Sequence, residues 1–102
     1  MKLFVDDQRA APLGWTCART VDEAIEYLTQ GAVTELSLDY DLGGSDTTGL
    51  DVLNWIESAV SAGRIVMPAM SAHSGSILGR RRLEAHIEWL EQRFKSSPAD
   101  DS

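Results

Sequence analysis

The sequence contains a single cysteine and no long apolar run, and both absences narrow what the chain can be. One thiol, Cys17, cannot form an internal disulfide, which is typical of proteins from a reducing compartment. The simplest interpretation of Cys17 is a buried structural thiol. No stretch approaches the roughly 20 consecutive apolar residues that a membrane helix needs, and the N-terminus turns acidic too early for a secretory leader. We therefore expect a cytoplasmic protein without membrane segments.

Basic residues are also scarce. Nine Lys and Arg stand against sixteen Asp and Glu, so the formal net charge is −7. This balance argues against duplex DNA as a partner, because binding to DNA depends on neutralising its phosphates. Arg80, Arg81 and Arg82 form the only basic run, and it follows a Ser/Gly turn that suits a small anionic ligand. Walker, zinc-ligand, nucleophile-elbow and dinucleotide-binding motifs are all missing.

The 102 residues are enough for one domain, which we place at residues 1–95, followed by a polar tail at 96–102 that we expect to be disordered. Apolar patterns predict strands at residues 3–5, 15–19, 33–39 and 69–73. Helices are predicted from the Thr20 cap to Gly31, from the Thr48 cap to Gly63, and after Ser76. Strands that alternate with helices in this way indicate a parallel sheet with helices packed on it.

Acidic residues follow two of the predicted strands. Asp6 and Asp7 come directly after the first strand, and Asp39 ends the third. In open parallel sheets, ligands bind outside the carboxyl ends of the strands, so these residues should share one rim. Carboxylates on one rim repel each other unless a cation joins them, and oxygen ligands suit Mg²⁺ or Mn²⁺. The alternative is that Asp7 is a solvated loop residue and Asp39 caps a turn.

Two further residues near this rim are candidates for proton transfer. His73 ends the fourth predicted strand and is a candidate general acid or base; the alternative is a histidine bonded to the backbone of a turn. Asp41 is either a second metal ligand, a general base or an Asx-turn residue. His86, in the middle of the last helix, is predicted to be structural or exposed.

The turn before the last helix is a candidate phosphate site. Ser74, Gly75 and Ser76 open that helix, where backbone N–H groups can hold an anion. Ser74 and Ser76 are thus predicted to bind phosphate, and Arg80, in the first turns, would clamp it with two hydrogen bonds. Arg81 and Arg82 are predicted to be surface charges.

Taken in order, these short motifs resemble the cyclic-phosphate processing receiver-like family, a reduced relative of response-regulator receiver domains. The resemblance covers nearly the whole chain and is carried by Asp6-Asp7-Gln8-Arg9 with Pro12 and Trp15, Arg19-Thr20 with Glu23-Ala24, residues 36–43 around Asp39, Thr48-Gly49-Leu50-Asp51-Val52 with Trp55-Ile56-Glu57, His73-Ser74, and Gly79-Arg80.

The resemblance implies a flavodoxin-like, three-layer α/β domain with about four parallel strands in the order 2-1-3-4 and three helices. It matches Asp6 and Asp7 to the receiver acidic pair that binds Mg²⁺, and Asp39 to the phosphoacceptor position. The chain departs from the pattern in several places. Residues 8–14 are too few for the helix that receivers carry there, and nothing supplies a fifth strand with its lysine. Tyr40 stands where this family usually has histidine, and Ser76-Ile77 where it has Asn-Pro.

Two hypotheses for function follow from the sequence. The first is a metal-dependent phosphoesterase or phosphate-binding protein that handles cyclic phosphate esters of nucleotides or RNA ends, a substrate class implied by the resemblance. The second is a non-catalytic signalling or protein-interaction module, for example an accessory protein of a phage or mobile element, whose acidic surface would suit a basic protein partner.

Overall fold

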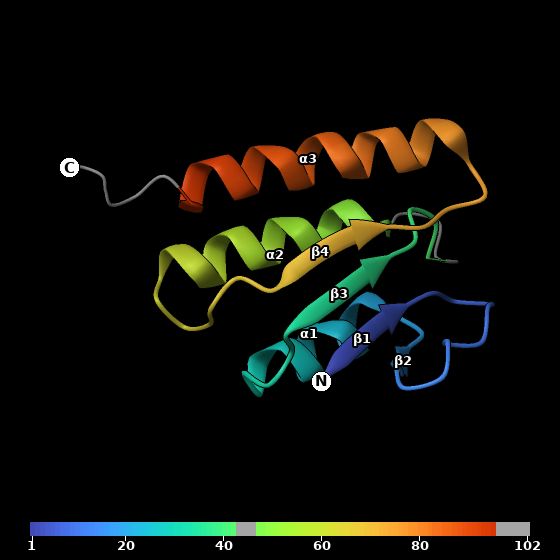
Figure 1. The fold of residues 1–102 in the computed structure, drawn as a ribbon, viewed down its shortest axis with the longest axis horizontal. Coiled ribbons are helices and arrows are strands. Elements are labelled where there is room, and N and C mark those ends of the chain that lie inside the picture. Colours follow the sequence, from blue (N-terminus) through green and yellow to red (C-terminus); the bar gives the residue numbers. More distant parts are fainter. Residues whose placement is uncertain (43–46, 96–102) are drawn as a thin grey trace.

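The computed structural model describes residues 1–42 and 47–95, so the predicted tail at 96–102 and part of the loop after Asp39 lie outside it. The elements in chain order are β1 (Lys2–Val5), β2 (Thr16–Ala18), α1 (Val21–Thr29), β3 (Glu35–Leu38), α2 (Gly49–Ser61), β4 (Ala69–Ala72) and α3 (Ile77–Lys95). The four strands form one parallel sheet in the order β2-β1-β3-β4 (Figure 1). The predicted strand number, strand order and helix number are confirmed.

The helix boundaries follow the predicted capping residues. The Thr20 side chain accepts a hydrogen bond from the backbone N–H of Glu23, and Thr48 and Asp51 form a complete reciprocal capping box at α2. Beyond the helix ends, Gly31 and Gly63 take φ values of 80° and 73°, a left-handed conformation that glycine adopts without a Cβ penalty. These short segments therefore encode where α1 and α2 begin and end.

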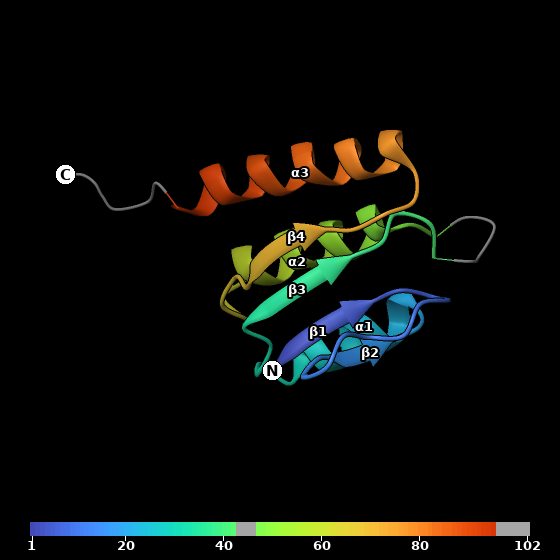
Figure 2. The same ribbon diagram turned by 45° about the vertical axis from the view of Figure 1, so that its right-hand side comes forward.

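All three helices share a core with one face of the sheet. Alternate strand residues Leu3, Val5, Leu36 and Leu38 are buried in one cluster with side chains of α1, α2 and α3. Helices α1 and α2 lie behind the sheet in Figures 1 and 2, and α3 runs beside β4 and contacts α2. None of the helices in the described ranges is long and apolar enough to cross a membrane.

The opposite face of the sheet differs from the expected three layers. Phe4 points to this face, where its ring meets Trp15 edge-on with centroids 6.4 Å apart and stacks on His73. In residues 1–42 and 47–95, side chains rather than a helix cover it. The physical reason is the short β1–β2 connection, which leaves no chain for a helix there. Cys17 lies on edge strand β2 and is only partly buried, so its prediction as a buried thiol was wrong.

Candidate functional site

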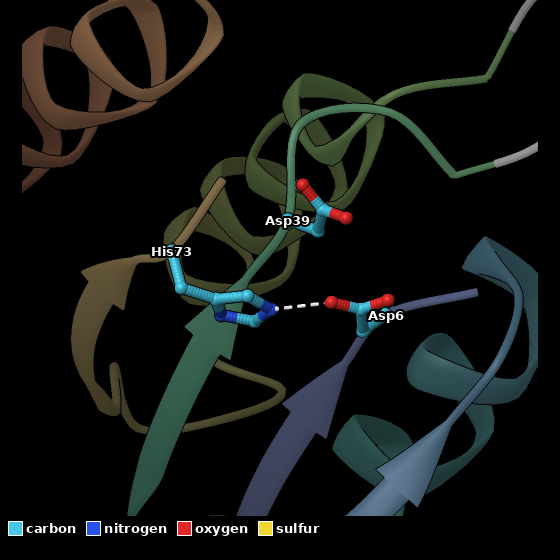
Figure 3. Close-up of side chains that lie close together, drawn as sticks. All are labelled: Asp6, Asp39 and His73. Atoms are coloured by element: carbon cyan, nitrogen blue, oxygen red, sulfur yellow. Dashed lines mark hydrogen bonds and ion pairs between the residues drawn. The ribbon is translucent and has the colours of Figure 1, made fainter. Parts of the chain in front are cut away.

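Three residues that directly follow neighbouring strands meet at one end of the sheet. Val5 of β1 pairs in register with Leu38 of β3, and Leu38 pairs with Ala72 of β4. The next residue on each strand is Asp6, Asp39 or His73. Each offers a ligand atom that lies within 4.8 Å of the other two (Figure 3). Parallel register therefore assembles the cluster directly, because equivalent strand ends lie side by side.

Asp6 is almost completely buried, with 1% of its surface exposed, and its carboxylate is held on both sides. Oδ1 accepts hydrogen bonds from the backbone N–H groups of Gln8 and Arg9, each at 2.8 Å. Oδ2 lies 3.0 Å from His73 Nε2. Burial raises the pKa of Asp6, but the Arg9 and Gln8 N–H groups together with His73 outweigh it, so the net pKa is below the usual value. Asp6 is thus an ionised carboxylate at neutral pH.

Asp39 is in the opposite electrostatic situation. Its Oδ1 accepts a hydrogen bond from the backbone N–H of Tyr40 at 2.8 Å. Burial raises the pKa of Asp39, and the negative charge of Asp6 raises it further. Bonds to Ser74 and Tyr40 and the nearby His73 act against this, but the net pKa lies above the usual value. The folded chain therefore places two negative charges close together, and the neighbouring groups offset the charge of Asp39 only in part.

His73 contacts Asp6 from the helix-free face of the sheet. Its Nδ1 lies 2.7 Å from Ser37 Oγ, and its ring stacks on Phe4 with centroids 4.1 Å apart and planes 5° apart. Because ionised Asp6 can only accept, Nε2 of His73 donates the hydrogen bond between them, and Nδ1 bonds to the Ser37 hydroxyl. The ring is thus bonded to two side chains rather than to the backbone, which was the alternative for a turn histidine.

A cavity of about 260 Å³ opens beside the two aspartates. From three separate segments, it brings together the predicted site residues Asp6, Asp7, Asp39, Asp41, Ser74 and Ser76, with Gln8, Arg9 and Gly75, for which no site role was predicted, beside them. His73 is not part of its lining. The cavity therefore has an acidic side, from the segments after β1 and β3, and a hydroxyl-bearing side, from the turn after β4.

The two serines of that turn have defined local partners. Ser74 Oγ accepts a hydrogen bond from Ser76 N–H at 3.1 Å and bonds to Asp39. Ser76 Oγ accepts from the N–H of Gly79 at 3.1 Å, which caps the first turn of α3. Arg80 does not join them: it is exposed and its Nε lies 3.9 Å from Glu84 Oε2, one helical turn away. The structure does not bring Arg80 to the cavity.

A larger cavity of about 570 Å³ lies between α2 and α3 and contains none of the predicted site residues. His86 borders it and meets Trp89 edge-on with centroids 5.9 Å apart. Among its described lining residues, Glu57 is the one carboxylate, and it is already paired with Arg93. This mostly apolar groove lacks the convergent titratable groups found at the strand ends, so the smaller cavity is the candidate functional site.

The comparison with protein families decides which family the chain belongs to. The model of the cyclic-phosphate processing receiver domain matches residues 1–89. The chain belongs to this family. Searches of curated proteins and of solved structures gave no match. The resemblance seen in the short motifs is thereby confirmed over most of the chain.

This cyclic-phosphate processing receiver domain also places a residue that sequence reasoning missed. Arg9 borders the cavity, and its Nη2 lies 3.4 Å from where a Cβ on Gly75 would stand. The available signal was its position three residues after Asp6, since the carboxylate of Asp6 bonds the Arg9 backbone and turns the loop back to the rim.

Tyr40, at the position where the resemblance led us to expect histidine, lies outside the cavity lining. Its ring packs on Gly79, where an added Cβ would come within 2.7 Å of the ring, and its hydroxyl accepts from Arg82 Nη1 at 3.3 Å. Tyr40 therefore fastens the loop after β3 to the first turns of α3. In this chain, that position serves packing.

Proposed function

We propose that this domain is a metal-dependent phosphoesterase that acts on cyclic phosphate esters of nucleotides or RNA ends. The observation that carries the proposal is the pair Asp6 and Asp39, which approach within 4.8 Å at the edge of one open cavity. Burial and the negative charge of Asp6 raise the pKa of Asp39, and the nearby His73, Ser74 and Tyr40 offset this only in part. A cation between them would relieve that repulsion.

The donor set fits a hard divalent cation. Asp6, Asp7, Asp39 and Asp41 border the cavity and offer carboxylate oxygens, the ligands that Mg²⁺ and Mn²⁺ prefer. We infer that Asp6 and Asp39 would hold it, with Asp7 at the rim. A bound cation of this kind supplies Lewis-acid polarisation of a phosphoryl oxygen.

The remaining roles follow from where the side chains lie. Asp41 is exposed at the cavity edge, where it would take a proton from an attacking water. The Ser74 and Ser76 turn would receive the phosphate group. His73 holds Asp6 from the far side through its 3.0 Å contact, so we assign it to positioning that carboxylate in place of the acid–base role expected from the sequence.

The proposal is tested by a hydrolysis screen of 2′,3′-cyclic and 3′,5′-cyclic nucleotides with Mn²⁺, followed by ³¹P NMR. We expect turnover of at least one cyclic phosphate by the wild type, and its loss in Asp39→Asn and in metal-free samples. Glu88→Gln is the matched control, because it also removes one negative charge, at an exposed position on α3. A wild type that binds Mn²⁺ but cleaves none of these esters contradicts the enzymatic proposal.

One observation favours a non-catalytic module as the second candidate. Tyr40 occupies the family's usual histidine position and packs against α3 instead of facing the cavity. In that case the metal and phosphate sites would serve binding only, and the acidic chain would recruit a basic protein partner. Cytoplasmic location stays a prediction under both candidates.

A further inference from the structure

We propose that Arg9 is the residue that binds the substrate phosphate in this cavity, a role that sequence reasoning assigned to Arg80. The inference rests on the proposed function, because it concerns the same cavity. Three observations on the described residues support it. They are how the Arg9 backbone is anchored, where its guanidinium lies, and whether a carboxylate pairs with it.

The backbone of Arg9 is fixed beside the metal-binding carboxylate. Its N–H donates to Asp6 Oδ1 at 2.8 Å, and its carbonyl oxygen accepts from Arg19 Nη1 at 2.7 Å. The same Arg19 nitrogen also donates to the backbone oxygen of Asp6 at 3.0 Å. Arg9 is thus anchored through main-chain groups, which leaves its side chain without a structural duty in these bonds.

The guanidinium of Arg9 crosses from the loop after β1 to the turn after β4. Its Nη2 lies 3.4 Å from the position that a Cβ on Gly75 would take, although four described carboxylates border the same cavity. No carboxylate in residues 1–42 and 47–95 forms an ion pair with it, whereas Arg80 pairs with Glu84. A guanidinium in this state keeps its planar fork of donors for a phosphate, which it can bind through two parallel hydrogen bonds.

The charges of the cavity explain why this residue is needed. The four carboxylates that the described part of the chain contributes to the lining repel a phosphate, and a divalent cation at Asp6 and Asp39 would offset only part of their charge. Within residues 1–42 and 47–95, Arg9 is the one arginine or lysine in the cavity lining, and its guanidinium lies beside Gly75, between Ser74 and Ser76. A phosphate held between the aspartates and this turn would therefore meet positive charge on both sides.

The test measures binding of inorganic phosphate to the full chain with saturating Mg²⁺, by ¹H–¹⁵N NMR titration. We expect Arg9→Gln to weaken phosphate binding by about tenfold, the cost of one charge-assisted hydrogen-bonded contact. Arg9→Lys should recover part of it, because the charge remains while the fork is lost. Arg80→Gln, the matched control on α3, should change the affinity by less than about twofold.

The outcomes separate this inference from the proposed function. Arg9→Gln should keep the wild-type response to Mg²⁺ in thermal unfolding, because the Asp6 contact uses the Arg9 backbone. Unchanged phosphate affinity in Arg9→Gln, a larger loss in Arg80→Gln, or a metal-loaded wild type that does not bind phosphate would overturn the role of Arg9. A wild type that does not respond to Mg²⁺ or Mn²⁺ would instead contradict the proposed function itself.

Discussion

Replacing Asp39 by Asn should make the metal-free protein more stable. The substitution removes one of two adjacent negative charges, while the Asn oxygen can still accept the hydrogen bond from Tyr40 N–H. At 4.8 Å, the upper limit for the separation of their ligand atoms, two unit charges repel each other by about 1 kcal/mol in water and about 3.5 kcal/mol at an effective dielectric constant near 20. Because Asp39 borders an open cavity and also loses its attraction to His73, we expect a gain of about 1 kcal/mol.

The assay is thermal unfolding followed by circular dichroism in excess EDTA. For a domain of this size, the expected gain corresponds to a rise in Tm of roughly 4 to 8 °C at neutral pH. Because the folded-state pKa of Asp39 is raised above its reference value of 3.8, the repulsion exists above that pKa and disappears as the pH falls through it. The difference between Asp39→Asn and the wild type should therefore shrink on acidification. Glu88→Gln, which changes the net charge equally, should show no such gain.

Addition of Mn²⁺ should reverse the order, because the wild type gains stability by mass action and Asp39→Asn gains little. A variant that is less stable than the wild type in EDTA at neutral pH would refute the reasoning. So would a stability gain that stays constant across the acid range, since it could not then arise from the charge of Asp39.

Four further substitutions, one of them a control, test other contacts in the fold and the site. Asp6→Asn should lower the free energy of unfolding by about 1–3 kcal/mol in urea titrations, because the amide N–H of Asn would face the His73 donor. Because the pKa of Asp6 is lowered in the folded protein, the wild type should lose this contribution only as the pH falls below the reference pKa of 3.8. Gly49→Ala should destabilise the protein by about 1–3 kcal/mol despite the better helix propensity of Ala, since the new Cβ would lie 2.4 Å from the Asp39 carbonyl oxygen. Gly75→Ala is the control and should be nearly neutral in the same assay, because its Cβ would come no closer than 3.4 Å to Arg9 Nη2. His73→Gln should weaken Mn²⁺ binding in calorimetry by about 10- to 100-fold while the fold is kept, and unchanged affinity would show that His73 does not position Asp6.

The architecture and the aspartate pair were predictable because both depend on local pattern. Capping residues such as Thr20 and Thr48 set the helix starts, and alternating strands and helices specify a parallel sheet. Once the strands are parallel and adjacent, Asp6 and Asp39 must lie at the same edge. Asp6 and Asp39 both border one open cavity, and the net pKa of Asp39 stays above its usual value because neighbouring groups only partly offset its burial and the charge of Asp6.

The direction of side chains on loops and helices was not predictable in the same way. Whether Arg80 reaches the cavity depends on how α3 docks, and in this structure Arg80 lies outside the cavity lining, with its Nε 3.9 Å from Glu84 Oε2. Arg9 comes to the rim because the Asp6 carboxylate bonds the loop backbone. The spacing of three residues between Asp6 and Arg9 hints at this contact, but it does not specify where the Arg9 side chain points. His73 turns to the helix-free face, where Phe4 and Ser37 hold its ring, because the β1–β2 connection has no helix to occupy that face.

The central claim is that a divalent cation binds between the ends of β1 and β3, and paramagnetic NMR tests it most directly. Substoichiometric Mn²⁺ should first broaden the amide signals of Gln8, Arg9 and Tyr40, whose N–H groups bond the two carboxylates, and Asp39→Asn should abolish this selective broadening. Signals of the acidic first turn of α1, at Asp22 and Glu23, should persist at the same Mn²⁺ concentration. Broadening that begins at α1, or that is equal at all exposed acidic residues, would contradict the claim.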